Sequence, residues 1–151
     1  EEQSQMTKPR ITNIDTLSAL FDRLITENIK LYFFNKENKE ENVKHQHKVI
    51  EEIKNRVTTL FKECISSGKY DYLSEERTFD ENSVVEELEQ LIFNDINIGE
   101  SDRERLKQVQ SDSPNLDKMI VNEKRLRKAN EGRAKNKNNI DKMFKKSIEE
   151  K

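Results

Sequence analysis

The two histidines of the chain lie in the stretch KHQHK, and they are the first residues whose type suggests chemistry, because imidazole nitrogens are common metal ligands. On a helix, residues two positions apart point about 200° away from each other, so His45 and His47 cannot easily share an ion. His47 and Glu51 lie one turn apart and could share one, with Asp22 or Glu27 of the preceding helix as a further ligand. The Glu-x-x-His pairs of carboxylate-bridged di-iron bundles are missing from the sequence. We therefore interpret His47 as a hydrogen-bonded residue at a helix edge, and we predict neither a metal ion nor a cofactor.

A second group of candidate residues is the acidic stretch EELEQ, which places three carboxylates close together: Glu86, Glu87 and Glu89. All-α nucleotide pyrophosphohydrolases hold Mg²⁺ with clusters of this kind, since phosphate chemistry needs a carboxylate-bound cation. Such an enzyme also needs an acidic pair on a neighbouring helix. The nearest downstream acids stand at a predicted helix end and turn: Asp95, Glu100 and Asp102. A solvated helix face is the favoured interpretation, and a magnesium-dependent hydrolase is kept as a second alternative function.

Nucleophilic and phosphate-binding patterns are missing as well. The stretch SSGK lacks the upstream glycine of a phosphate-binding loop, and Tyr70 stands where a Ser or Thr should coordinate the ion. Cys64 is the only cysteine, which excludes an intramolecular disulfide, and its place on an apolar helix face is typical of an inert buried thiol. We predict no catalytic residue and favour a protein that is not an enzyme.

The composition favours helices over strands. Among 151 residues, 32% are apolar and 38% are charged, and only three Gly and two Pro are available for the tight turns of a sandwich or barrel. Because the apolar content limits the size of a compact core, an elongated or oligomeric helical protein is expected. No apolar run approaches the length that crosses a membrane, and we expect a soluble, cytoplasmic protein.

Apolar residues at helical spacing predict two long helices in the first half of the chain. The first carries its apolar face from Ile14 to Tyr32, with Thr12 as its N-cap. The second has the most regular stripe, from Val43 to Cys64, in a heptad-like spacing that is typical of coiled coils. Gly68 is expected to end it.

Shorter helices are expected after residue 83. The apolar face from Val84 to Ile92 predicts a third helix, and NIGE, residues 97–100, is expected to break it. Ser101 and Glu104 have the spacing of a capping box and predict a separate short helix.

The last predicted helix is long and charged. Ser113 is its expected N-cap and Pro114 its first residue, while Gly132 is expected to weaken it. The sequence therefore predicts an all-α bundle of three or four helices with an extended, charged C-terminal helix. We divide the chain into a flexible N-terminal segment, a helical bundle domain and a basic C-terminal helix or tail: residues 1–11, 12–131 and 132–151.

Aromatic residues mark two candidate partner-binding segments. The stretch LYFF at the end of the first helix is apolar all round, so it must be deeply buried or covered by a partner. Its candidates are Tyr32, Phe33 and Phe34. The loop GKYDYLSEERTF contains residue types that anchor interfaces, and it either packs on its own core or is offered to a partner. Its candidates are Tyr70, Tyr72, Arg77 and Phe79.

The charges of the chain are segregated along the sequence. Residues 71–104 hold twelve acidic and two basic residues, a net charge of −10, whereas residues 117–146 hold eleven basic and four acidic residues, a net charge of +7. The basic segment could lie against the acidic one, within the chain or between chains, and so set the orientation of helices. It could instead bind nucleic-acid phosphates, or form a frayed solvated tail. The nucleic-acid candidates are Lys124, Arg125, Arg127, Lys128, Arg133, Lys135 and Lys137.

The function that these observations favour is a non-enzymatic interaction or assembly module. It would act through helix–helix contacts in a homo-oligomer or a larger intracellular complex, and the segregated charges would orient the contact. An accessory nucleic-acid-binding protein that uses the basic C-terminal helix is the first alternative.

Overall fold

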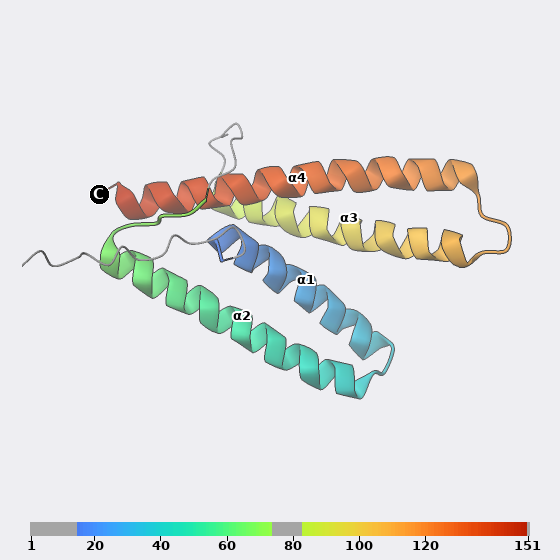
Figure 1. Cartoon of the computed structure of the whole chain (residues 1–151), viewed down its shortest axis with the longest axis horizontal. Helices are drawn as coiled ribbons and strands as arrows, with labels where there is room; N and C mark the ends of the chain where they lie inside the picture. The colour runs from blue at the N-terminus through green and yellow to red at the C-terminus, as the bar shows by residue number, and fades with distance from the viewer. Residues whose placement is uncertain (1–14, 74–82, 151) are drawn as a thin grey trace, which may run out of the picture.

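A computed structural model describes residues 15–73 and 83–150, which form four α-helices (Figure 1). Their bounds are α1 Leu17–Lys36, α2 Glu40–Ser67, α3 Val84–Gln110 and α4 Leu116–Glu149. The predicted all-α helical bundle is confirmed. Helix α4 is 34 residues long and carries the basic C-terminal stretch without a break at Gly132. The segment 1–11 lies outside the described residues.

Helices α1 and α2 form an antiparallel hairpin. The N-cap of α1 is Thr16, whose Oγ1 accepts a hydrogen bond from the amide of Ala19 at 3.2 Å, so the prediction of Thr12 was wrong. The connection to α2 is only residues 37–39, and Asn38 takes the left-handed conformation with φ of 55°. Helix α2 ends as predicted at Gly68, where φ is 66°.

Helix α3 runs unbroken through the predicted break. It starts with a capping box in which the hydroxyl of Ser83 accepts from the amide of Glu86 at 3.1 Å. Ser101, predicted to cap a separate helix, is buried inside α3, and its carbonyl accepts a hydrogen bond from Asn122 of α4 at 2.8 Å. One internal glycine costs a helix about 1 kcal/mol, and packing along α4 offsets a cost of that size. The prediction of two helices here was therefore wrong.

Helix α4 begins later than the sequence indicated. Its N-cap is Asn115, whose side chain accepts from the amide of Lys118 at 3.0 Å, and not Ser113. Pro114 consequently precedes the helix. Gly132 lies at a close approach of α4 to α3, because a Cβ built there would come within 2.6 Å of Nδ2 of Asn94.

The hydrophobic core lies where the start of α1, the end of α2 and the C-terminal half of α4 meet, with Leu91 of α3. Tyr70 is stacked on Tyr72 with 4.7 Å between ring centroids, and it meets Phe144 edge-on at 4.8 Å. Phe144 also packs on Phe61 at 4.9 Å. The buried apolar residues of this core are Leu17, Leu20, Leu60, Cys64, Tyr70, Tyr72, Leu91, Ile140 and Phe144.

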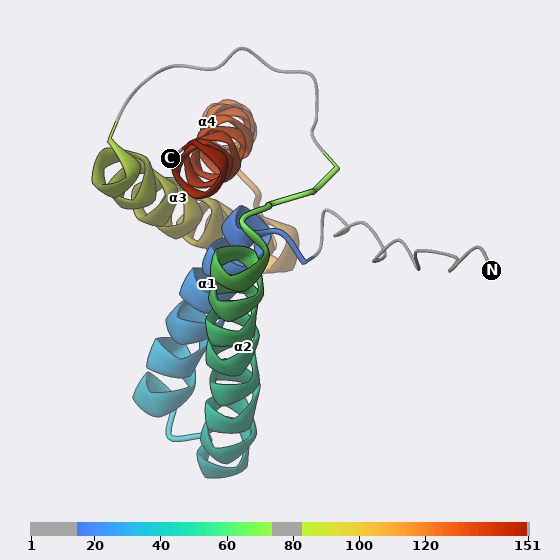
Figure 2. The ribbon, with the colours of Figure 1, turned by 90° about the vertical axis from the view of Figure 1, so that its left-hand side faces the viewer.

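The two hairpins share this core and diverge away from it. Figure 1 shows the α1–α2 hairpin turning away from the α3–α4 hairpin, so that the far end of α1 is separated from α3, and Figure 2 shows α1 and α2 extending to one side of the α3–α4 pair. The bundle is therefore splayed. The part of α3 that faces the far end of α1 is left for a surface rather than a core.

Candidate protein-binding surface

An apolar groove lies between α1 and α3 on the side where the hairpins diverge. Its volume is about 610 Å³. Tyr32 is 61% exposed, Ile96 42% and Ile92 38%, although each is a large apolar side chain. Fully burying a side chain of this size stabilises a protein by roughly 1.5–3 kcal/mol, so the groove offers binding free energy to a partner. The residues that line it are Leu24, Ile25, Asn28, Ile29, Tyr32, Phe33, Ile92, Ile96, Gly99 and Glu100.

The three aromatic candidates of α1 take different positions. Tyr32 and Phe33 line the groove and pack edge-to-face, with 5.1 Å between ring centroids. The guanidinium carbon of Arg103 lies 3.1 Å from the centre of the Phe33 ring and so connects α3 to the end of α1. Phe34 instead lines a hollow between α1 and α2. Tyr32 and Phe33 are thus placed where a partner could reach them.

The tyrosines of the predicted binding loop are part of the core. Tyr70 is fully buried and Tyr72 nearly so. For these two residues the self-packed alternative applies, and they offer little surface to a partner. Arg77 and Phe79 of the same loop lie outside the described residues.

Tyr70 belongs to a buried hydrogen-bond network at the start of α1. Asp141 of α4 accepts from the Ser18 amide at 2.9 Å, from the Tyr70 hydroxyl at 2.9 Å and from the Ser18 hydroxyl. The Tyr70 hydroxyl in turn accepts from the Leu17 amide at 2.8 Å. Burial raises the pKa of Asp141 despite these hydrogen bonds, and burial together with the Asp141 charge raises the pKa of Tyr70. The network ties α1, the segment after α2, and α4 together.

A second buried cluster joins α1, α3 and α4. Nε of Arg133 lies 3.0 Å from both carboxylate oxygens of Asp22 and 3.4 Å from Oδ1 of Asp95. Burial acts to raise the pKa of Asp22, but hydrogen bonds and the charges of Arg133 and Lys137 hold that pKa below its ordinary value. Burial and the neighbouring Asp22 carboxylate raise the pKa of Asp95 to about 8.

A carboxyl group with the pKa of Asp95 has the acidity of a general acid at neutral pH. However, Asp22 and Asp95 are each only 3% exposed, so a substrate cannot reach them. The cluster holds three helices together, and we assign it no catalysis.

The acidic residues proposed for Mg²⁺ do not converge on one site. Glu86 caps its own helix. Glu87 is buried, and its carboxylate accepts from the amide groups of Asn136 at 2.8 Å and Asn139 at 2.9 Å. Glu89 is exposed on a different side of α3. The expectation that all three lie on a solvated face was therefore wrong for Glu87, because Asn136 and Asn139 satisfy its charge inside the α3–α4 interface.

The histidine candidates are on the surface. His47 and Glu51 are both exposed on α2. Neither carboxylate suggested as a further ligand is directed to His47, because Asp22 binds Arg133 and Glu27 accepts from Gln46. Within residues 15–73 and 83–150, no group of three or more His, Cys, Asp or Glu side chains is arranged to hold a metal ion. Cys64 is a buried free thiol, as predicted, and burial raises its pKa.

The basic segment lies against the acidic segment within the chain, as the first of the three charge interpretations proposed. Arg125 donates to Asn97 at 2.6 Å and pairs with Glu100. Arg105 of α3 pairs with Glu123 of α4 at 2.7 Å. Exposed pairs of this kind add little stability but fix which helix faces meet.

The nucleic-acid candidates are consequently divided between the interior and the surface of the chain. Arg133 and Lys137 face Asp22 and Arg125 faces α3, which removes them from a continuous exposed strip. The others are exposed: Lys124, Arg127, Lys128 and Lys135. Nucleic-acid binding stays a prediction that depends on these four residues.

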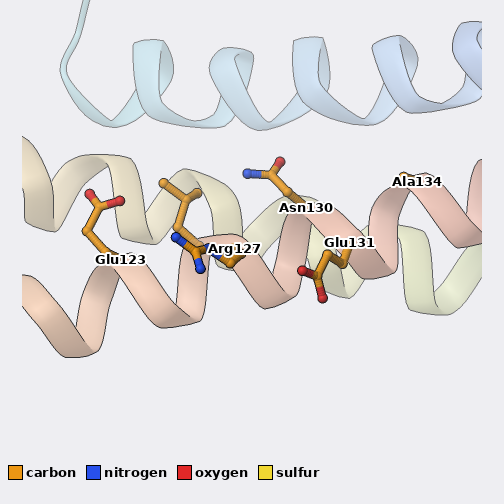
Figure 3. A pocket seen from close by; sticks show the side chains of 6 residues that line it. Glu123, Arg127, Asn130, Glu131 and Ala134 are labelled. Carbon is orange, nitrogen blue, oxygen red and sulfur yellow. The ribbon is translucent and has the colours of Figure 1, made fainter.

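Arg127 also lines a shallow hollow on α4 with a volume of about 430 Å³ (Figure 3). Glu123 and Glu131 stand one helical turn before and after Arg127, so the local charge of the hollow is mixed. A mixed-charge hollow is a poor binding site for a polyanion.

The sequence interpretation missed the α3 side of the groove. Phe93 and Ile96 follow Leu91 and Ile92 in the stretch LIFNDINI, which places apolar residues on more than one side of the helix. That excess was a usable indication of a second apolar face, since one core-facing stripe does not need it. By contrast, no sequence pattern indicates that Asp95 is buried.

Comparison of the chain with protein-family models, with curated proteins and with solved structures finds no match. The candidate surface is therefore supported by the geometry of this chain alone. In the described part of the chain, no helix combines the length and the apolar character that crossing a membrane requires.

Proposed function

We propose that this chain is a non-enzymatic helical interaction module that binds another protein helix in the groove between α1 and α3, in a homo-oligomer or a larger complex. The observation that carries the proposal is the groove itself: an apolar surface of about 610 Å³ in a chain with little apolar sequence to spare. Recognition of an amphipathic helix in an apolar groove is a common mode of protein binding.

The orientation of the bound helix would come from polar groups at the groove. Asn28 supplies one on the α1 wall, and Arg103 sits at the end of the groove over Phe33. Such groups add specificity more than affinity. A cytoplasmic location belongs to the same proposal, and the single, buried, free cysteine is compatible with it.

A site-specific photo-crosslinking experiment tests the proposal. A photoreactive phenylalanine analogue replaces Tyr32 in the groove, and in a matched control it replaces His47, which is exposed on α2 outside the groove. We expect irradiation to produce a protein adduct from position 32 and not from position 47. The introduction of a charge by Ile92→Glu should abolish the adduct. Equal adducts from both positions, or none from either, would contradict the proposal.

A further inference from the structure

The face of α3 beside the groove carries exposed apolar residues, three of which stand between two opposite charges. Val85 and Phe93 are each 67% exposed, and Ile92 and Ile96 are partly exposed. Seven residues, or about two helical turns, separate Ile96 from Glu89 on one side and from Arg103 on the other, so all three point in nearly the same direction. We name this set the α3 face: Val85, Glu89, Ile92, Phe93, Ile96 and Arg103.

Gly99 lies beside this face and opens a space above the helix. A Cβ built at Gly99 would meet no atom of the described residues within 4 Å, whereas one built at Gly132 would meet Asn94 at 2.6 Å. Packing between α3 and α4 therefore accounts for Gly132. Glycine inside a helix costs stability relative to alanine, and no contact in the described residues accounts for that cost at Gly99.

The α3 face is complementary to itself when a second helix runs in the opposite direction. With Ile96 at the centre, residues equally far before and after it lie at the same height, and those near the centre line of the face are brought together. Glu89 and Arg103 each lie about 20° from that line, so a pair of opposite charges meets. Ile92 and Gly99 lie on the same side of the line, so Ile92 of one copy meets the open space at Gly99 of the other. Phe93 is on the other side, opposite Glu100, whose carboxylate is directed to Arg125 of α4 rather than across the face.

We propose that the α3 face binds a second copy of this chain, with α3 packed antiparallel on α3 across a twofold axis that passes by Ile96. Ile92 of each copy fills the space above Gly99 of the other, at the edge of the groove, and two Glu89–Arg103 pairs flank the axis. This rests on the proposed function and names its partner. A twofold interface requires the same surface on both copies to match itself, which the order of charges on the α3 face provides.

A charge exchange tests the pairing directly. The dissociation constant of the dimer is measured by sedimentation equilibrium for the full chain and for the variants E89R, R103E and E89R/R103E, with circular dichroism as the control for folding. Each single variant alters two symmetric pairs and should weaken the dimer about tenfold. The double variant restores opposite charges across the axis, and we expect it to return to within about threefold of the original constant. A double variant at least as weak as the single variants would overturn the proposed register.

Cysteine crosslinking tests the axis independently of charge. A residue on a twofold axis faces its own copy, so Ile96→Cys should form a disulfide-linked dimer under mild oxidation. Val121→Cys is the matched control, because Val121 is an exposed apolar residue of α4 that is not part of the α3 face. Crosslinking equal to that of the control would overturn the proposal.

The outcomes separate this inference from the proposed function. A chain that stays monomeric into the high micromolar range, but whose residue 32 crosslinks to a different protein, overturns the second copy and leaves the interaction module standing. A dimer that ignores the charge exchange and the cysteine at position 96 overturns the α3 face as its interface and leaves the interaction module standing. A chain that stays monomeric and forms no protein adduct from residue 32 in the groove overturns both the dimer and the proposed function.

Discussion

Replacing Asp95 by asparagine is expected to stabilise the protein, and to do so increasingly as the pH rises. Asp95 is buried beside Asp22, and its pKa is about 8 in the folded chain against an ordinary value of 3.8. Between these two values the folded state binds more protons than the unfolded state, so the free energy of unfolding falls as the pH rises. Asparagine has the same shape and carries no charge to bury, so it removes this loss.

The size of the effect follows from the shift in pKa. Each pH unit between the unfolded and folded values costs the folded state about 1.4 kcal/mol. At pH 7 this gives an upper limit of roughly 4 kcal/mol for an isolated group. Asp22, whose pKa is lowered, titrates together with Asp95 and returns part of that energy. We therefore expect Asp95→Asn to gain about 1–2 kcal/mol at pH 7, and almost nothing near pH 4.

The assay is urea denaturation followed by circular dichroism, repeated across the range from acid to mildly basic pH at one protein concentration. Asp102→Asn is the matched control, because Asp102 is exposed on the same helix and should change the stability by less than about 0.5 kcal/mol. If the original chain and Asp95→Asn lose stability in parallel as the pH rises, Asp95 does not hold the proton and the reasoning is refuted.

Three further substitutions test the packing. Gly99→Ala should stabilise the monomer by about 0.5–1 kcal/mol in thermal denaturation at low protein concentration. Gly132→Ala should gain less stability or lose some, because its Cβ displaces the hydrogen-bonded amide of Asn94. Equal gains for the two variants would argue against the close approach of α3 and α4. Glu87→Ala leaves one N–H of Asn136 and one N–H of Asn139 without their carboxylate acceptor and should cost about 2–3 kcal/mol, against less than about 0.5 kcal/mol for exposed Glu89→Ala. Tyr70→Phe removes a hydroxyl that both donates and accepts a hydrogen bond, so it should lower the free energy of unfolding by about 1 kcal/mol or more. A smaller loss on denaturation would show that the network contributes little to stability.

The interface between α3 and α4 buries mainly polar side chains and leaves large apolar side chains of α3 exposed. Its buried positions are largely polar, with Asn94, Asn122 and Asn136 bonded across the interface, while Ile92 and Phe93 of α3 point outward. Buried amides fix the register of two helices because only one pairing satisfies their donors and acceptors. The outward apolar residues then remain for another contact, which is why the groove and the α3 face lie on this helix.

Local sequence signals were reliable where one residue decides a backbone conformation. Gly68 ended α2 as predicted, because only glycine takes the left-handed conformation without strain. The same logic failed for Ser101, which has the spacing of a cap but lies inside a helix. A capping box indicates a helix start only if the preceding residues are not helical, and packing on α4 kept them helical.

The candidate site could be predicted only in part. The excess of apolar residues in LYFF indicated a surface in need of cover, and Tyr32 and Phe33 do line the groove. The apolar excess of LIFNDINI indicated a second apolar face on α3, but its place opposite α1 could not be predicted, because it depends on the angle at which the two hairpins cross.

The amino-acid sequence by itself determined that the chain is helical and where α2 ends, because these follow from helical periodicity and backbone freedom. It left the contact between the acidic and the basic segment as one of three interpretations. Only the tertiary structure decided which charges are buried, so that Glu87 and Asp95 became interior residues while neighbours of the same type stayed in water. The physical reason differs between the two: the Glu87 carboxylate is buried because Asn136 and Asn139, 49 and 52 residues away in the chain, donate to it, whereas Asp95 is buried as a carboxyl group that keeps its proton.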